Sequence, residues 1–137
     1  SDYMDLMRAV RTASANPQAD AEQLFSQMLY NIGVNNTDDH AKNFSMLLTD
    51  EGYRLSPSYD VTPNTDPYPH AASICGLPRA DLDEVSVLHF AKKLNISTDV
   101  ALSIRSKVVT AIAQWEHVAR QCGVGEADIA LIEKRMY

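Results

Sequence analysis

A run of polar side chains between residues 35 and 45 carries the residue types that phosphoryl transfer needs. Asp38, His40 and Asn43 stand close together there, and Asp60 follows further along the chain. A carboxylate can accept the proton of an attacking hydroxyl, and carboxylate and amide oxygens are the ligands that Mg²⁺ prefers. The sequence therefore predicts a site that places a base and a divalent cation beside a phosphate donor, with charge neutralisation as its main contribution.

The spacing of these residues makes the prediction more specific. Asp38 precedes Asn43 by five residues, and Asp60 comes after a predicted turn. Protein kinases have the same separation between the catalytic Asp and a metal-binding Asn, and a second metal-binding Asp beyond a short hairpin. Asp39 lacks this spacing to Asn43, so we prefer Asp38 as the base and expect Asp39 to face solvent.

Simpler interpretations exist for the same residues. Asp38, His40 and Asn43 could belong to a polar capping loop, and Asp60 could form an Asx turn ahead of a proline. Asp39 and His40 could bind zinc, but adjacent residues rarely chelate one tetrahedral ion and the sequence shows no partner cluster. The segment Leu-Ser-Pro-Ser-Tyr-Asp that ends at Asp60 favours the phosphotransfer interpretation.

The elements that must position these residues are mostly helical. Apolar spacing predicts helices over 2–13 and 17–33, the second beginning after Asn16 as N-cap. A β-hairpin is expected over 44–56, followed by a proline-rich loop, and residues 83–136 are expected to form a helical bundle. Within that bundle we predict two apolar faces, which consist of Val85, Leu88, Ala91 and Leu94 in its first helix and of Val100, Ile104, Val108, Ile112, Trp115 and either Val118 or Ala119 in its long second helix.

Composition indicates an ordinary globular domain. The 137 residues are 45% hydrophobic and carry a formal net charge of −6, which does not favour direct binding to a nucleic-acid backbone. Cys75 and Cys122 are expected to be reduced, partly buried thiols of a cytoplasmic protein. No apolar run is long enough to span a membrane, and the N-terminus is no signal peptide. Because position 1 is Ser, the chain is expected to be part of a longer protein.

Two segments resemble one known family. Residues 36–45 are similar to the catalytic loop of HipA-type serine/threonine kinases, and residues 55–61 are similar to the metal-binding segment of that family. A weaker similarity continues through 73–76 and 82–94. The resemblance implies that 1–137 is the helical C-terminal lobe of a kinase-like fold. It also implies a bacterial toxin of a toxin–antitoxin pair that uses ATP and Mg²⁺.

The resemblance also implies a role for each residue. Asp38 would be the catalytic base, Asn43 and Asp60 would bind Mg²⁺, His40 would brace the loop, and Lys42 would face the phosphates of ATP. The glycines form no phosphate-binding loop, and in the family that part lies upstream. We therefore expect the 137 residues to be inactive by themselves.

The implied partners are proteins. An antitoxin is expected to bind, DNA would be contacted only through that antitoxin, and the substrate is a protein, for which an aminoacyl-tRNA synthetase is the known kind. Two alternatives remain open. The chain could be a kinase-like pseudoenzyme or protein-binding module of a toxin–antitoxin complex, or it could belong to a phosphotransferase for a small molecule or lipid.

Overall fold

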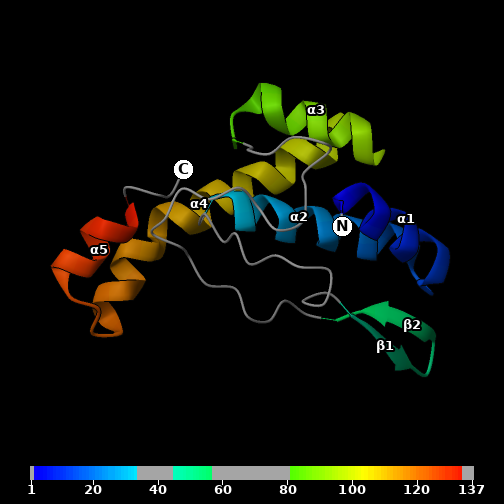
Figure 1. The fold of residues 1–137 in the computed structure, drawn as a ribbon, viewed down its shortest axis with the longest axis horizontal. Coiled ribbons are helices and arrows are strands. Elements are labelled where there is room, and N and C mark those ends of the chain that lie inside the picture. The colour runs from blue at the N-terminus through cyan, green and yellow to red at the C-terminus, as the bar shows by residue number, and fades with distance from the viewer. Residues whose placement is uncertain (1, 34–44, 57–80, 134–137) are drawn as a thin grey trace.

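The structure is a computed structural model, which describes residues 2–33, 45–56 and 81–133. Within these ranges it is mainly helical with one two-stranded antiparallel sheet, as the sequence predicts (Figure 1). The elements in chain order are α1 (Tyr3–Ala13), α2 (Pro17–Gly33), β1 (Met46–Thr49), β2 (Gly52–Leu55), α3 (Glu84–Leu94), α4 (Thr98–Gln121) and α5 (Glu126–Glu133).

Short polar side chains begin most of these helices. Asp2 Oδ1 accepts a hydrogen bond from the Met4 amide at 2.7 Å, and Asn16 Oδ1 accepts one from the Ala19 amide at 3.2 Å. Asp83 and Ser97 cap α3 and α4 in the same way. Such caps satisfy backbone donors that have no partner inside the helix. The predicted bounds of the second helix, 17–33, are confirmed.

The core lies around α2, which packs against α1 on one side and α4 on the other, while α3 packs on α4. This arrangement places α2 in the middle of Figure 1. Fully burying a large apolar side chain contributes about 1.5–3 kcal/mol to folding. The largest fully buried side chains are Tyr3, Phe25, Phe90, Met7, Leu24, Met28, Leu29, Leu82, Ile129 and Val87.

The apolar face predicted for α3 is partly wrong. Val85 is 79% exposed, whereas Val87 and Phe90 are buried together with Ala91 and Leu94. Both sets have helical spacing, so periodicity alone allows either. The buried set is the one that α3 turns towards the core, and it includes the larger Phe90 side chain.

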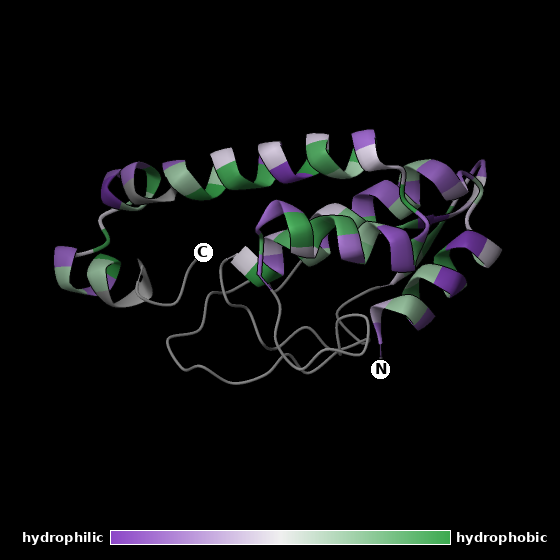
Figure 2. Cartoon of the chain, turned by 90° about the horizontal axis from the view of Figure 1, so that it is seen from above, coloured by the Kyte–Doolittle hydropathy of each residue, from purple (hydrophilic) through white to green (hydrophobic). Residues whose placement is uncertain are grey.

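The long helix α4 follows its predicted stripe. Val108 and Ile112 are buried, and of the two alternatives near the end Ala119 is buried while Val118 is 51% exposed. The side chain of Trp115 lies outside the described residues. Hydrophobic and hydrophilic residues alternate along the helix in Figure 2.

The C-terminal end of α4 is defined by Gly123, which adopts a φ of +84° directly after the C-cap Cys122. This left-handed region favours glycine. Cys122 is a free, exposed thiol there, which corrects the expectation of a partly buried one, whereas Cys75 lies outside the described residues. None of the described helices is long and apolar enough to cross a membrane.

Candidate active site

The five residues predicted to do chemistry lie outside the described part of the chain. Asp38, His40, Lys42 and Asn43 fall within residues 34–44, and Asp60 falls within residues 57–80. The structure does describe the elements from which these segments continue. These are the end of α2 and the two ends of the β1–β2 hairpin, and their geometry decides how the two segments can be brought together.

The hairpin has a two-residue turn that fixes its register. Thr49 pairs with Gly52 across the turn, and the Thr49 hydroxyl donates a hydrogen bond to the Gly52 carbonyl at 2.7 Å. Gly52 has a φ of +116°, a conformation that a side chain would strain. The register then runs down the strands to the pair Met46 and Leu55. A shift of this register by one residue would turn every side chain of the shifted strand to the opposite face of the sheet.

This register brings together Ser45 and Ser56, which lie at the open end of the hairpin and border the two predicted segments. The Ser56 amide donates to the Ser45 carbonyl at 2.8 Å, and the Ser45 hydroxyl donates to the Ser56 hydroxyl at 3.0 Å. Ser45 directly follows the segment predicted to hold the base, and Ser56 directly precedes the segment predicted to hold the second metal ligand. The hairpin therefore holds Ser45 and Ser56, the described residues that border the two segments, next to each other.

A buried carboxylate attaches the hairpin to α2. Asp20 is 0% exposed, and its two oxygens accept hydrogen bonds from Arg54 Nε at 3.1 and 3.0 Å and from Arg54 Nη2 at 3.0 Å. The same carboxylate accepts from the Leu55 amide at 2.8 Å and from the Ser14 hydroxyl at 2.6 Å. A guanidinium that binds both carboxylate oxygens fixes orientation as well as distance.

These contacts set the protonation state of Asp20. Burial raises the pKa of its carboxyl, but hydrogen bonds from Arg54, Ser14 and the Leu55 amide outweigh that effect and hold the pKa below its ordinary value. The hydrogen bond to Asp20 in turn raises the pKa of Arg54. The pair therefore stays charged, and every donor around the carboxylate contributes to keeping it so.

Two further hydrogen bonds hold the hairpin against the helices. Gln23 Nε2, one turn after Asp20, donates to the Ser56 carbonyl at 3.0 Å. The Ala15 amide donates to the Tyr53 carbonyl at 2.7 Å. The β2 strand is thus tied to α2 and to the α1–α2 connection at consecutive points along its length.

The segment 34–44 is preceded by Gly33, the last residue of α2. A Cβ built on Gly33 would lie 2.1 Å from Cδ1 of Ile112 and 2.9 Å from Cδ1 of Leu82. Real carbon contacts are about 3.5–4.0 Å, so glycine lets α2 approach α4 and Leu82 closely here. Gly33 is the residue from which the chain continues into 34–44, so this close approach fixes where that segment starts.

The chain was compared with known proteins. A model of the HipA-like C-terminal domain matches residues 1–132. The chain belongs to this family. The similarity noted in two short segments therefore extends over nearly the whole chain, including the helices outside both segments.

Two relatives show the same correspondence. A Sinorhizobium fredii protein named "Putative kinase Y4mE" is 27% identical over 134 residues. The fold of the HipA-like domain also matches a chain in the Shewanella oneidensis MR-1 HipA, HipB and operator DNA complex, with a TM-score of 0.76 at 19% identity. The match covers 98% of this chain in both cases, but only 26% of the Sinorhizobium protein and 33% of the Shewanella chain. The HipA-like domain thus spans between a quarter and a third of these relatives.

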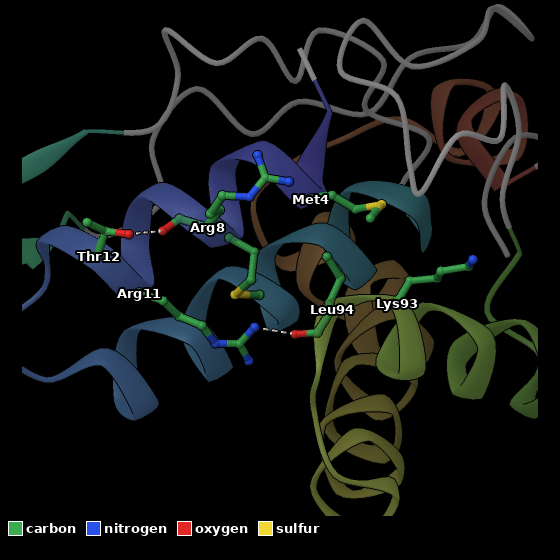
Figure 3. Close-up of a pocket in the computed structure, with 7 residues that line it drawn as sticks. Met4, Arg8, Arg11, Thr12, Lys93 and Leu94 are labelled. Atoms are coloured by element: carbon green, nitrogen blue, oxygen red, sulfur yellow. Dashed lines mark hydrogen bonds between the residues drawn. The ribbon is translucent and has the colours of Figure 1, made fainter.

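The described residues also contain a pocket of about 300 Å³ between α1 and α3 (Figure 3). Arg11 lies at its edge, and its guanidinium donates to the carbonyls of Leu94 and Asn95 at the end of α3. A cation there satisfies carbonyls that lack a helical partner. We therefore assign Arg11 of the HipA-like domain to holding α3 in place.

The described ranges offer no alternative metal centre, since no group of three or more His, Cys, Asp or Glu side chains is placed there to hold an ion. Sequence reasoning missed Asp20 and Arg54, although one signal was present. Asp20 lies four residues before Leu24 and eight before Met28, so a charged residue stands on the apolar stripe of α2. Such a residue needs a buried partner.

Proposed function

We propose that this HipA-like domain supplies the base and metal-binding half of a serine/threonine protein kinase that uses ATP and Mg²⁺. Asp38 would accept the proton of the substrate hydroxyl, and Asn43 and Asp60 would bind the ion. His40 would brace the loop by hydrogen bonding, and Lys42 would face the phosphates. The donors fit the ion, because carboxylate and amide oxygens suit a hard cation. Bound Mg²⁺ would neutralise the charge of the phosphate oxygens.

The observation that carries the proposal is the closure of the hairpin at Ser45 and Ser56. Asn43 stands two residues before Ser45 and Asp60 four residues after Ser56, so the hairpin links both proposed metal ligands to one paired base of the sheet. A kinase requires this proximity, because one ion must contact both ligands while the base reaches the hydroxyl. A protein-binding module would have no need of an Asn at position 43 and an Asp at position 60.

The two adjacent carboxylates at 38 and 39 allow a matched test. Transfer of radiolabelled phosphate from ATP should fall by about 10²–10⁴-fold in Asp38→Ala of the full-length protein, the range typical for loss of a general base. Asp39→Ala removes the same charge one residue away and should retain most of the activity. Equal losses in both variants would contradict the assignment of the base.

The metal ligands need a separate measurement. Asn43→Ala and Asp60→Ala should weaken binding of Mn²⁺, used as a spectroscopic substitute for Mg²⁺, in the presence of a non-hydrolysable ATP analogue. A pseudoenzyme would bind the ion no differently in either variant. The 137 residues alone should transfer no phosphate, because they contain no glycine-rich loop to hold the nucleotide.

The proposed substrate and partners are those that the resemblance to the family implies. We propose a protein hydroxyl as the acceptor, with an aminoacyl-tRNA synthetase as the first substrate to test, and an antitoxin protein as the binding partner. The Shewanella chain occurs in a complex with HipB and operator DNA, which supports an antitoxin. The net charge of −6 disfavours direct binding to DNA. The domain alone should not retard operator DNA in a gel, whereas its complex with the antitoxin should.

A further inference from the structure

The hairpin buries little apolar surface. Leu55 is 6% exposed, but Leu47, Leu48 and Tyr53 are 50%, 73% and 51% exposed. A two-stranded hairpin is only marginally stable by itself in water. Leu55 and the partly buried Met46 pack on the core, and contacts other than apolar packing must add to them to set the position of the hairpin on the helices.

Asp20 is the group that makes most of those contacts. Its carboxylate accepts the Arg54 guanidinium and the Leu55 amide, both from β2, and also accepts the Ser14 hydroxyl from the α1–α2 connection. Each of these donors comes from outside α2, so the carboxylate joins three parts of the chain at one buried point. The aligned guanidinium fork and the backbone amide leave β2 little freedom to rotate or slide along the helix.

The contacts continue directly into the base of the hairpin. Leu55, held through its amide by Asp20, is followed by Ser56, whose carbonyl accepts from Gln23 and whose amide donates to Ser45. Ser56 is only 7% exposed although it is polar. The residue that leads into the segment with Asp60 is thus held by Gln23 of α2 on one side and by Ser45, which precedes β1, on the other.

We propose that Asp20 is a positioning residue for the phosphotransfer site. Together with Arg54 it fixes β2 on α2, and it thereby fixes the point from which the chain continues to the proposed metal ligand Asp60. This inference rests on the proposed kinase function and adds to it a residue that touches neither nucleotide nor metal. It makes the affinity for the divalent ion depend on the ion pair between the buried Asp20 carboxylate and the partly exposed Arg54 guanidinium.

Two conservative variants of the full-length protein test the positioning role. Asp20→Asn keeps the volume of the side chain but loses its charge, and Arg54→Lys keeps the charge but loses the planar fork. The matched control is Phe90→Leu, a core change in α3 remote from the hairpin. The stability of each variant is measured by urea unfolding. Binding of Mn²⁺ is then compared at temperatures at which all the proteins have the same folded fraction.

The first readout is binding of Mn²⁺ in the presence of a non-hydrolysable ATP analogue, followed by electron paramagnetic resonance. We expect the dissociation constant to rise at least tenfold in Asp20→Asn and by a smaller factor in Arg54→Lys. It should stay within twofold of wild type in Phe90→Leu. The second readout is hydrogen exchange, in which the amides of β1 and β2 should exchange at least tenfold faster in Asp20→Asn only.

The outcomes separate the inference from the function on which it rests. If wild type binds Mn²⁺ and transfers phosphate, but Asp20→Asn and Phe90→Leu weaken Mn²⁺ binding equally, Asp20 serves stability alone and the positioning role is refuted. If wild type neither binds Mn²⁺ nor transfers phosphate, the proposed function is refuted, and the inference that rests on it is refuted as well. Unchanged hairpin exchange in Asp20→Asn would also refute the inference.

Discussion

Gly33→Ala should destabilise the domain through one identifiable contact. The new Cβ would lie 2.1 Å from Cδ1 of Ile112 and 2.9 Å from Cδ1 of Leu82. Overpacking of this kind costs about 1–3 kcal/mol, whereas replacing glycine in a helix returns about 0.5–1 kcal/mol. We expect a net loss of about 1–2 kcal/mol in the free energy of unfolding.

The contact can be tested by removing the atom that causes most of the overlap. Ile112→Val deletes Cδ1, and Cγ1, the other Ile112 atom near the new Cβ, lies at 3.5 Å, an ordinary contact distance. Alone, Ile112→Val should cost about 0.5–1.5 kcal/mol. In Gly33→Ala with Ile112→Val the two losses should not add, and a coupling energy of about 1 kcal/mol should favour the double variant.

Urea unfolding of the four proteins in this cycle measures the coupling. In thermal unfolding a loss of 1 kcal/mol should appear as a fall of roughly 3–5 °C for a chain of this size. Additive losses in the double variant, or a Gly33→Ala protein as stable as wild type, would refute the assignment of the close α2–α4 approach to this glycine. The result matters for the site because Gly33 precedes the segment that holds the proposed base.

Three further predictions concern single side chains. The pKa of Asp20 lies below its ordinary value of 3.8. Its charged form therefore adds stability that is present above that pH and is lost as the pH falls towards the folded-state pKa. The difference in stability between wild type and Asp20→Asn, measured by urea unfolding, should shrink as the pH is lowered below 3.8. Asp83→Ala removes the N-cap of α3 and should lower the midpoint of thermal denaturation, with Asp83→Ser close to wild type. Arg11→Met keeps the apolar stem but loses the bonds to Leu94 and Asn95; it should cost about 1.5–3 kcal/mol and speed amide exchange at the end of α3, and unchanged exchange would show that Arg11 does not hold that end.

Local signals predicted most of the fold. The bounds of α2 follow from Asn16 as a cap and from Gly33 as a stop, and the hairpin follows from the turn residues 50–52 between two short apolar runs. These features depend on residues only a few positions apart, and a single sequence contains that information. The predicted roles within 34–44 and 57–80 stay predictions, because those residues lie outside the described structure.

Periodicity could not decide which face of α3 is buried. Val85 and Val87 are two positions apart, about 200° around a helix, yet each heads a set with helical spacing. The choice depends on the partner surfaces, here mainly α4, and on the burial of the large Phe90 side chain in the core. Information of that kind is distributed over distant parts of the sequence, so the apolar pattern of one helix does not contain it.

The sequence did not predict the contact between Asp20 and Arg54 either, because the two residues are 34 positions apart. An ion pair with a buried carboxylate is a costly way to attach a hairpin, since the charge of Asp20 must leave water while Arg54 stays 30% exposed, and apolar side chains of similar size often stabilise as well. Apolar contacts, however, allow sliding, whereas a guanidinium on both oxygens of a carboxylate allows one geometry. A hairpin that precedes the proposed metal ligand Asp60 needs a fixed orientation more than it needs stability. This requirement gives a physical reason for a charged residue on the apolar stripe of α2.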